Sequence, residues 1–351
     1  MSETMRVDML AEARNAQWSA DTFLGVGSIK LVAPAKVNLF LNVGARRADG
    51  YHNVTNVMHA VALHDTLHVN CVPAGDMDAS SPLPEHVAVG GPEENLLVNI
   101  DVADKTSIPG IETSPLSIPA RDNIVFRAVD ALARAVGRTQ REKVFVRIEK
   151  HIPHEGGLGG GSSNAAAALV AMAHFWGLAP DDAVVGNVAR TLGADVAFFL
   201  HGGCALLTGS GENLDRALGA AKGSVVLVKP SAGVSTAAAY RAFDESPVAV
   251  SADQAEAVAR AQSAVDVPLV NNLAPAAEGL AGELSEVKAW LAAQPGVREG
   301  RVLLCGSGAT TFAETTDNAA ACAIVAAAQA RGWWARATTF SSLRAAKLPA
   351  R

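Results

Sequence analysis

Five glycines fall within six residues of the sequence, in the stretch HIPHEGGLGGGSSN at residues 151–164. Because glycine has no Cβ, the backbone there can turn sharply and aim several N–H groups at one anion. The stretch follows a predicted strand at 143–149 and opens into a predicted helix, whose first turn carries unpaired N–H donors and partial positive charge. This order predicts a phosphate-binding loop. The simpler alternative is a flexible surface turn.

The residue order of this loop separates it from two common phosphate-binding motifs. A Walker loop needs Lys followed by Ser or Thr after its last glycine, and the dinucleotide-binding motif needs a glycine where Ser162 stands. Here two hydroxyl residues, Ser162 and Ser163, follow Gly161 instead. They could cap the helix or bind the Mg²⁺ that accompanies ATP.

Two charged residues lie in apolar surroundings. Lys36 interrupts the stretch APAKVNLFLNV, and Asp195 precedes the apolar residues VAFF. Taken alone, a lysine that points outward from an edge strand and an aspartate in a loop or helix cap are the simpler interpretations. Neither residue by itself identifies an active site.

Hydrophobic periodicity predicts the elements that must position these residues. In the first half we expect strands at 29–43 and 60–70 joined by a turn at 46–50, a helix at 124–136, the strand and helix around the glycine loop, and a helix at 182–192. In the second half we expect strands at 224–228 and 301–304 and helices at 236–243, 254–264, 281–293 and 318–330. Residues 73–120 contain seven prolines and little periodicity, so there we expect a long excursion rather than regular elements.

Composition excludes several classes of protein. The net charge is −6 and Lys and Arg are scattered, which argues against a nucleic-acid partner. The longest apolar run has ten residues, at 319–328, too few to cross a bilayer. Cys71, Cys204, Cys305 and Cys322 are far apart, which argues against a zinc site or a disulfide framework and favours the cytoplasm. Residues 1–28 lack a signal-peptide core, so we expect a flexible N-terminal extension.

Three segments together resemble the GHMP small-molecule kinases. They are PAKVNLFLNVGARRADGYH (34–52), PHEGGLGGGSSNAAAAL (153–169) with GADVAFF (193–199), and LLCGSGATTFA (303–313). The similarity continues through NIVFRAVDAL, GVSTAAAYRAFD and NNLAPAA, and so covers most of the chain from about residue 32 to 332.

The resemblance implies an α+β fold with the two-domain GHMP kinase architecture. A ribosomal-protein-S5-like N-terminal domain at 29–222 would bind ATP, and a ferredoxin-like C-terminal domain would span 223–351. Lys36 and Asp195 would be the catalytic pair. The residues expected to bind ATP are Lys150, Pro153, His154, Glu155, Gly156, Gly157, Leu158, Gly159, Gly160, Gly161, Ser162 and Ser163, and those expected to bind the acceptor substrate are Asn38, Tyr51, His52, Gly306, Ser307 and Gly308.

The resemblance also implies the partners of the reaction. ATP would be the co-substrate, with Mg²⁺ bound by Ser163, and RADGYH indicates a cytidyl-linked sugar alcohol as the acceptor. We expect no nucleic-acid, membrane or obligate protein partner. Glu155 departs from the family pattern, in which a small residue is usual, and we expect its carboxylate to point to solvent. Two alternatives stay open: a GHMP kinase for another small alcohol, and a nucleotide-binding regulator without catalysis, against which the retention of both Lys36 and Asp195 argues.

Overall fold

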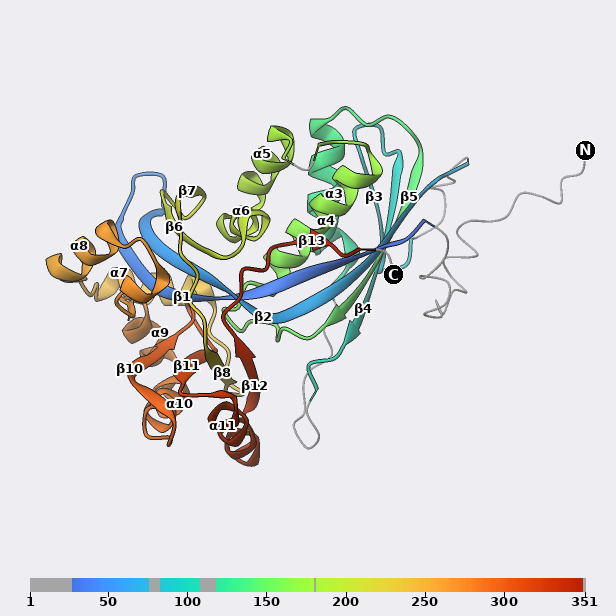
Figure 1. Cartoon of the computed structure of the whole chain (residues 1–351). Coiled ribbons are helices and arrows are strands. Elements are labelled where there is room, and N and C mark those ends of the chain that lie inside the picture. The colour runs from blue at the N-terminus through green and yellow to red at the C-terminus, as the bar shows by residue number, and fades with distance from the viewer. Residues whose placement is uncertain (1–26, 76–82, 108–117, 180, 350–351) are drawn as a thin grey trace, which may run out of the picture.

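The computed structural model describes residues 27–75, 83–107, 118–179 and 181–349 (Figure 1). Within them the strands form a nine-stranded sheet and a four-stranded sheet. Most of the predicted N-terminal extension, residues 1–26, lies outside the described residues. No helix in the described part of the chain is both long and apolar enough to span a membrane.

A long antiparallel hairpin forms the centre of the first sheet. It consists of β1 (Ile29–Arg46) and β2 (His52–Pro73), and it confirms the two predicted strands and their turn. Residues 31–41 of β1 are buried without interruption, because helices cover one part of the strand and the second sheet covers the other. The main path of the sheet is β13-β1-β2-β5-β4-β3.

The expectation of an irregular excursion at 73–120 was wrong for the residues that the structure describes there. β3 (Val87–Gly90) and β4 (Leu96–Asp104) both belong to the first sheet. β4 pairs in parallel with β5 (Glu142–Lys150) over nine residues. The prolines lie outside these strands, so they separate the strands rather than prevent them. Residues 76–82 and 108–117 of the predicted excursion lie outside the described residues.

Helices that cover one face of the first sheet position the glycine loop. They are α3 (Ile124–Ala135), α4 (Gly160–Phe175), α5 (Ala183–Leu192) and α6 (Ala194–His201) (Figure 1). The side chain of Asn123 caps α3 by accepting from Val125 N at 2.9 Å, and the short 3-10 turn η2 (Ala120–Asp122) precedes it. Residues 165–168 of α4 are four buried alanines, which allow a close approach to the sheet. The predicted helices and strand of this region are confirmed.

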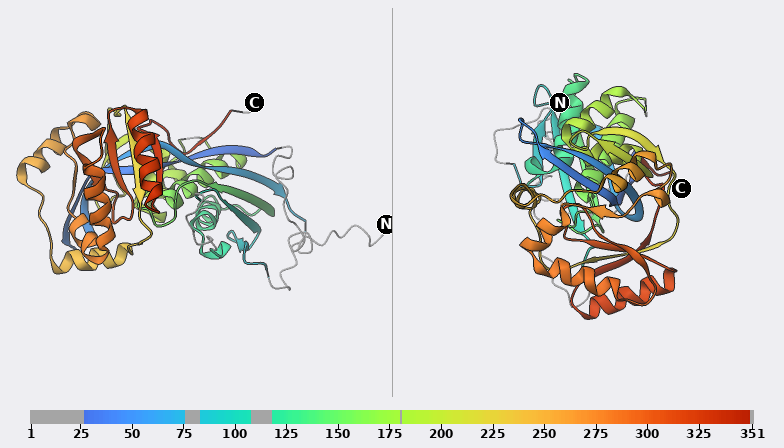
Figure 2. Two further views of the ribbon diagram at one scale, coloured as in Figure 1. Left: turned by 90° about the horizontal axis from the view of Figure 1, so that it is seen from below. Right: turned by 90° about the vertical axis from the view of Figure 1, so that its left-hand side faces the viewer.

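The second sheet is antiparallel and has the order β10-β11-β8-β12. Its strands are β8 (Ser224–Lys229), β10 (Val297–Leu304), β11 (Thr311–Thr315) and β12 (Trp334–Thr339). The other elements of this half are α7 (Thr236–Glu245), α8 (Ala252–Arg260), η3 (Ala264–Asp266), α9 (Ala274–Leu280), α10 (Gly282–Ala292) and α11 (Asn318–Ala330). The predicted strands and helices of this half are confirmed. Figure 2 shows this part gathered to one side of the long hairpin.

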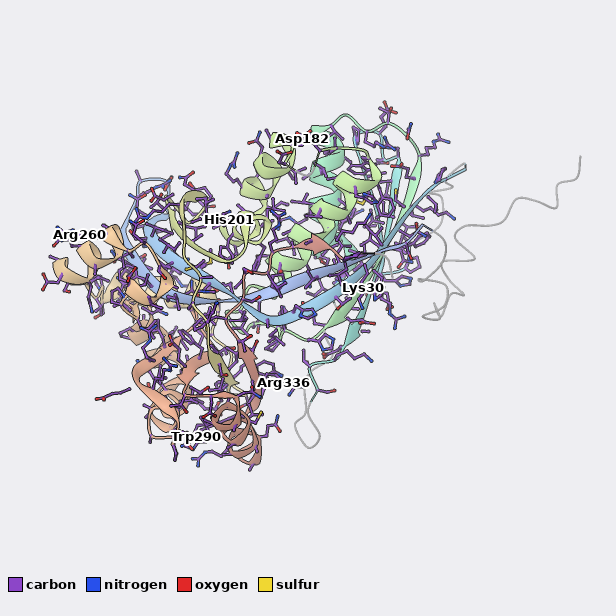
Figure 3. The ribbon with its side chains drawn as sticks, viewed as in Figure 1. Lys30, Asp182, His201, Arg260, Trp290 and Arg336 are labelled. Carbon is purple, nitrogen blue, oxygen red and sulfur yellow. The ribbon has the colours of Figure 1, made fainter. Side chains whose placement is uncertain are left out.

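The two faces of the second sheet have different neighbours. Val226 and Val228 pack on residues of α10 and α11, where Trp290 (Figure 3) meets the ring of Trp333 at 5.3 Å. Leu227 and neighbouring side chains of the opposite face join a core with Val37 and Leu39 of β1. The second sheet is therefore joined to the first through an apolar interface.

The chain returns to the first sheet after entering the second. β9 (Val270–Asn271) pairs with Phe40 and Leu41 of β1, and β13 (Ala346–Lys347) pairs with Leu31 and Val32. β6 (Cys204–Thr208) and β7 (Asn213–Leu218) extend the first sheet from β2 toward this junction. The boundary at 222/223 remains a prediction.

Candidate active site

The glycine loop runs from the end of β5 to the start of α4. Gly159 precedes the helix with φ 72°, a left-handed conformation that glycine adopts readily. A Cβ on Gly159 would lie 2.7 Å from the Phe199 ring and 3.2 Å from the Lys36 side chain. The loop therefore needs glycine there both for its backbone conformation and for space.

A second glycine turn packs against this loop through backbone contacts. Ala309 N donates to Glu155 O at 3.3 Å, and Thr310 N donates to Gly156 O at 3.1 Å. A Cβ on Gly157 would overlap the carbonyl oxygen of Cys305. The side chain of Asn271 on β9 holds the turn from the other side, donating to Leu304 O at 2.9 Å and to Gly306 O at 2.7 Å.

Lys36 and Asp195 are brought together as predicted. Lys36 N donates to Leu158 O at 3.0 Å, which ties β1 to the glycine loop. Lys36 Nζ lies 3.6 Å from Asp195 Oδ2, and the two side chains are 5% and 31% exposed. Asp195 stands in the first turn of α6. The site therefore pairs a buried ammonium with a carboxylate that solvent or a substrate can reach.

A line of amide side chains holds the lysine. Lys36 Nζ donates to Asn38 Oδ1 at 2.8 Å, and Asn38 Nδ2 donates to Asn56 Oδ1 at 2.9 Å. Asn38 was predicted for the substrate side, and it contacts the lysine directly. Asn56 was missed by the sequence analysis, because nothing in its own sequence neighbourhood distinguishes it from an ordinary polar residue of a strand.

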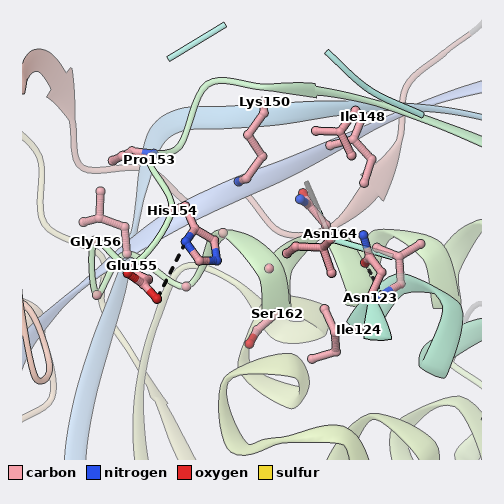
Figure 4. Close-up of a pocket in the computed structure, with 18 of the residues that line it drawn as sticks. Asn123, Ile124, Ile148, Lys150, Pro153, His154, Glu155, Gly156, Ser162 and Asn164 are labelled. Atoms are coloured by element: carbon pink, nitrogen blue, oxygen red, sulfur yellow. Dashed lines mark hydrogen bonds and ion pairs between the residues drawn. The ribbon is translucent and has the colours of Figure 1, made fainter. Parts of the chain in front are cut away.

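A cavity of about 370 Å³ opens on the other side of the glycine loop (Figure 4). Ile124 and Ile148 contribute apolar walls, and Asn123 and Asn164 contribute amides. Asn164 is 3% exposed, and its Oδ1 has no hydrogen-bond partner in the described structure. This arrangement suits a flat heterocycle with a polar edge. These four residues were not predicted from the sequence, although Asn164 directly follows the two predicted serines.

Lys150 lines the cavity, but its charge is paired. Its Nζ forms an ion pair with Asp65, which is fully buried. The other oxygen of Asp65 accepts from His151 N at 2.7 Å and from Ile152 N at 2.8 Å. A Cβ on Gly160 would lie 2.7 Å from Lys150 Nζ. The pair thus fixes the start of the loop under the helix N-terminus.

The remaining predicted ATP residues differ in exposure. Ser162 lines the cavity, whereas Ser163 is fully buried and its Oγ lacks a partner in the described part of the chain. The His154 and Glu155 side chains are 52% and 69% exposed, in keeping with the expectation that Glu155 points to solvent. Among the described residues no group of three His, Cys, Asp or Glu could hold a metal ion.

None of the predicted acceptor residues lines this cavity. A Cβ on Gly306 would lie 3.6 Å from Asn38 Oδ1 and 3.8 Å from Lys36 Nζ, so the second glycine turn borders the lysine. Ser307 Oγ lies 2.9 Å from Thr236 Oγ1 at the start of α7, and Gly308 follows with φ 94°.

Tyr51 and His52 are adjacent in sequence but differ in environment. Tyr51 is 64% exposed, whereas His52 is buried and its ring lies 5.2 Å from that of Tyr240 on α7. Burial and the negative charge of Asp195 raise the pKa of Tyr240. Tyr240, also missed by the sequence analysis, therefore links the environment of His52 to that of Asp195.

Comparison with known proteins agrees with this geometry. Residues 123–203 match the family model described as the GHMP kinases N terminal domain. A 4-diphosphocytidyl-2-C-methyl-D-erythritol kinase of Pelotomaculum thermopropionicum is 37% identical over 82% of this chain and 90% of its own length. A kinase of the same name from Azorhizobium caulinodans is 35% identical over 87% and 96%.

Solved structures show the same relationship. A crystal structure of 4-(cytidine 5'-diphospho)-2C-methyl-D-erythritol kinase superposes with a TM-score of 0.63 at 30% identity, covering 89% of this chain and all of that one. A homoserine kinase from Cytophaga hutchinsonii shares the fold, with a TM-score of 0.61 at 19% identity over 92% of this chain and 97% of its own. The chain is therefore a small-molecule kinase that belongs to the 4-diphosphocytidyl-2-C-methyl-D-erythritol kinase family of the GHMP kinases.

Proposed function

We propose that the chain transfers the γ-phosphoryl group of ATP to the C2 hydroxyl of 4-diphosphocytidyl-2-C-methyl-D-erythritol, forming the 2-phosphate and ADP. The observation that carries this proposal is the Lys36 to Asp195 pair, 3.6 Å apart beside the glycine loop, in a chain whose relatives bear that substrate's name. Phosphoryl transfer depends mainly on positioning and on charge stabilisation.

In this reaction the hydroxyl oxygen forms a new bond to the γ-phosphorus while the bond from that phosphorus to the ADP oxygen breaks. Asp195, the accessible member of the pair, accepts the hydroxyl proton. Lys36 stabilises negative charge on the carboxylate and on the transferring phosphoryl group. Asn38 and Asn56 hold the Lys36 ammonium in place.

The nucleotide would occupy the glycine loop and the cavity behind it. The phosphates would lie at the N-terminus of α4, where unpaired N–H groups favour an anion. The adenine would lie between Ile124 and Ile148 with its polar edge toward Asn164. ATP would enter as its Mg²⁺ complex. Ser163 was the predicted protein ligand, but it is fully buried and absent from the cavity lining, whereas Ser162 lines the cavity and is the better placed of the two hydroxyls.

The acceptor would bind on the Asp195 side of the loop. Tyr51 offers an exposed ring for stacking on the cytosine, with His52 and Tyr240 beside it. The second glycine turn, from Gly306 to Gly308, would border the sugar alcohol next to Lys36.

Finer assignments of fold and location belong to this proposal as well. The second sheet has its strands in the chain order 2-3-1-4, which supports a ferredoxin-like C-terminal domain at 223–351. The ribosomal-protein-S5-like description of 29–222 and the cytoplasmic location are proposals that rest on the sequence.

An ADP-release assay with a panel of acceptors tests the proposal. The cytidyl-linked sugar alcohol should give the highest kcat/KM, well above those of homoserine and mevalonate. Preference for another alcohol would leave the fold assignment intact and replace the substrate. Binding of an ATP analogue without ADP release for any acceptor would instead favour the non-catalytic regulator.

A further inference from the structure

His52 is anchored across the junction between the two halves of the molecule. It is the first residue of β2, yet its Nε2 lies 2.7 Å from Asp244 Oδ1 in the last turn of α7. Its ring also packs near Phe243, at a centroid distance of 6.4 Å. One side chain therefore fixes the end of the β1–β2 hairpin to a helix 192 residues later in the chain.

This anchoring limits what the His52 ring can do. A carboxylate only accepts hydrogen bonds, so the hydrogen of the contact resides on Nε2, which is no longer available to a ligand. The His52 side chain is 6% exposed, whereas that of Asp244 is 30% exposed. The contact therefore holds the ring at the end of the hairpin, and the other nitrogen of the neutral ring, Nδ1, can act only as an acceptor.

The segment that His52 holds carries the exposed ring of Tyr51. The turn has its own hydrogen bonds: Arg47 N donates to Tyr51 O at 2.7 Å, and Tyr51 N donates to Asp49 Oδ1 at 3.0 Å. These bonds shape the turn but do not connect it to α7. The His52 contact does, with a weaker second link from Arg46 Nη1 to Asp244 Oδ2 at 3.9 Å.

Helix α7 presents two relevant side chains at once. Asp244 holds His52, and Tyr240, one turn earlier, packs against the His52 ring. Burial and the negative charge of Asp195 raise the pKa of Tyr240. Through these two side chains, α7 connects the Tyr51 turn with the surroundings of Asp195, the carboxylate that would accept the proton.

We propose that Asp244 is a positioning residue for the acceptor: through His52 it fixes the Tyr51 turn relative to Tyr240 and Asp195. This inference rests on the proposed function, because the acceptor must carry a base that uses the Tyr51 ring. Loss of the contact lets the turn move and weakens acceptor binding. ATP binding and the chemical step at saturating acceptor do not depend on it.

Steady-state kinetics with the cytidyl-linked acceptor tests this role. Asp244→Ala should raise the acceptor KM about tenfold, the scale of one hydrogen bond to a charged group, with kcat and the KM for ATP within about twofold of wild type. Asp244→Asn retains an oxygen that accepts from Nε2 and should restore most of the affinity. Glu245→Ala, which alters the next, exposed residue, is the matched control and should behave as wild type.

A double-mutant cycle tests the route through His52. Adding Asp244→Ala to His52→Phe, which keeps an aromatic ring but loses the hydrogen bond, should raise the acceptor KM no further. His52→Phe alone gives the same test if Asp244→Ala does not fold. An acceptor KM that is unchanged in Asp244→Ala would overturn the inference, and so would additive effects of the two substitutions on the acceptor KM. If Asp244→Ala does not fold, an unchanged acceptor KM in His52→Phe would overturn it. Absence of wild-type turnover with this acceptor would instead refute the proposed function.

Discussion

At the scale of single residues, exposure distinguishes the two members of the Lys36 to Asp195 pair. The Lys36 side chain is 5% exposed and is held by Asn38, whereas the Asp195 side chain is 31% exposed. A group that exchanges a proton with a substrate must be reachable, and a group that supplies a fixed charge benefits from burial, because charge interactions strengthen away from water. The geometry therefore supports the proposal that Asp195 accepts the proton.

Asp195→Asn keeps the size of the side chain and removes its ability to accept the proton. We expect kcat to fall by about 10²–10⁴, the range for a positioned acid or base group, with the Kd of an ATP analogue unchanged by calorimetry. Asp215→Asn, which alters an exposed carboxylate of β7 paired with Arg216, is the control. A kcat above about a tenth of wild type in Asp195→Asn would contradict the assignment.

Glu155 is a charged residue in the glycine loop with φ 52°. Glycine adopts this left-handed conformation more easily than any residue with a Cβ, by about 1–2 kcal/mol, and it has no carboxylate to repel triphosphate. Glu155→Gly should therefore raise the free energy of unfolding by about 1 kcal/mol and lower the KM for ATP about two- to fivefold, the scale of exposed charge interactions.

Glu155→Gln separates the two effects, because it removes the charge and keeps the Cβ. It should lower the KM for ATP without raising the free energy of unfolding. A higher KM for ATP in both variants would show that the carboxylate helps to bind the nucleotide.

At the scale of elements, the site depends on two glycine turns that meet through their backbones. The loop before α4 and the turn at 305–310 exchange hydrogen bonds at Glu155 and Gly156, and Gly157 lies against the carbonyl groups of Cys305 and Gly308. Because a backbone carbonyl cannot rotate away as a side chain can, this contact tolerates no Cβ.

Gly157→Ala should therefore destabilise the protein by about 2–4 kcal/mol, the sum of a left-handed alanine and an overpacked contact. Gly161→Ala is the matched control, because a Cβ there meets only Ile124 at 3.7 Å. Urea unfolding of both variants gives the comparison. Equal stability of the two variants would mean that the turns do not pack as described.

Elements with clear periodicity were predictable from the sequence, and distant partners were not. The helix at 124–136 repeats its apolar residues at helical spacing, and the strand at 143–149 alternates apolar and charged residues. Both were confirmed, as α3 and β5. β3, of four residues, and β4, of nine, were missed because neighbouring prolines made the whole segment read as irregular.

The residues of the site also divide into those that local sequence motifs predicted and those that only distant contacts reveal. The sequence motifs located Lys36, Asp195 and the glycine loop. Asn56 and Asp244 act on residues 18 and 192 positions away, and a local sequence pattern contains no information about such contacts.

At the scale of the whole molecule, β1 connects two cores. Leu31 and Ala33 belong to the core under the helices of the first sheet, whereas Val37 and Leu39 belong to the core shared with the second sheet. The strand passes from one core to the other between Ala33 and Ala35, and Lys36 follows directly. The site therefore depends on the junction of the two halves as much as on either half.

His59 is a buried histidine at this junction. It lies on β2, accepts from Ala221 N at 2.8 Å in the segment that leads to β8, and packs its ring 4.6 Å from Phe340 beyond β12. Its Nδ1 donates to Ala60 O at 2.8 Å. Both nitrogens are therefore engaged by a neutral ring, and burial lowers the pKa of His59 from 6.5 to about 4.

The lowered pKa of His59 predicts that the protein loses stability at acid pH, over a defined pH range. As the pH falls below 6.5, the unfolded chain binds a proton at His59, but the folded protein does not until about pH 4. The stability contributed by the neutral ring is thus fully present above pH 6.5 and is lost between pH 6.5 and 4, by about 3 kcal/mol in total. His59→Gln keeps an oxygen that can accept from Ala221 N and does not titrate in this range. Urea unfolding gives the free energy of unfolding of wild type and of His59→Gln at each pH. The difference, wild type minus variant, should fall by about 3 kcal/mol from pH 7 to pH 4. A difference that stays constant over this range would show that His59 takes up its proton equally in the folded and unfolded states.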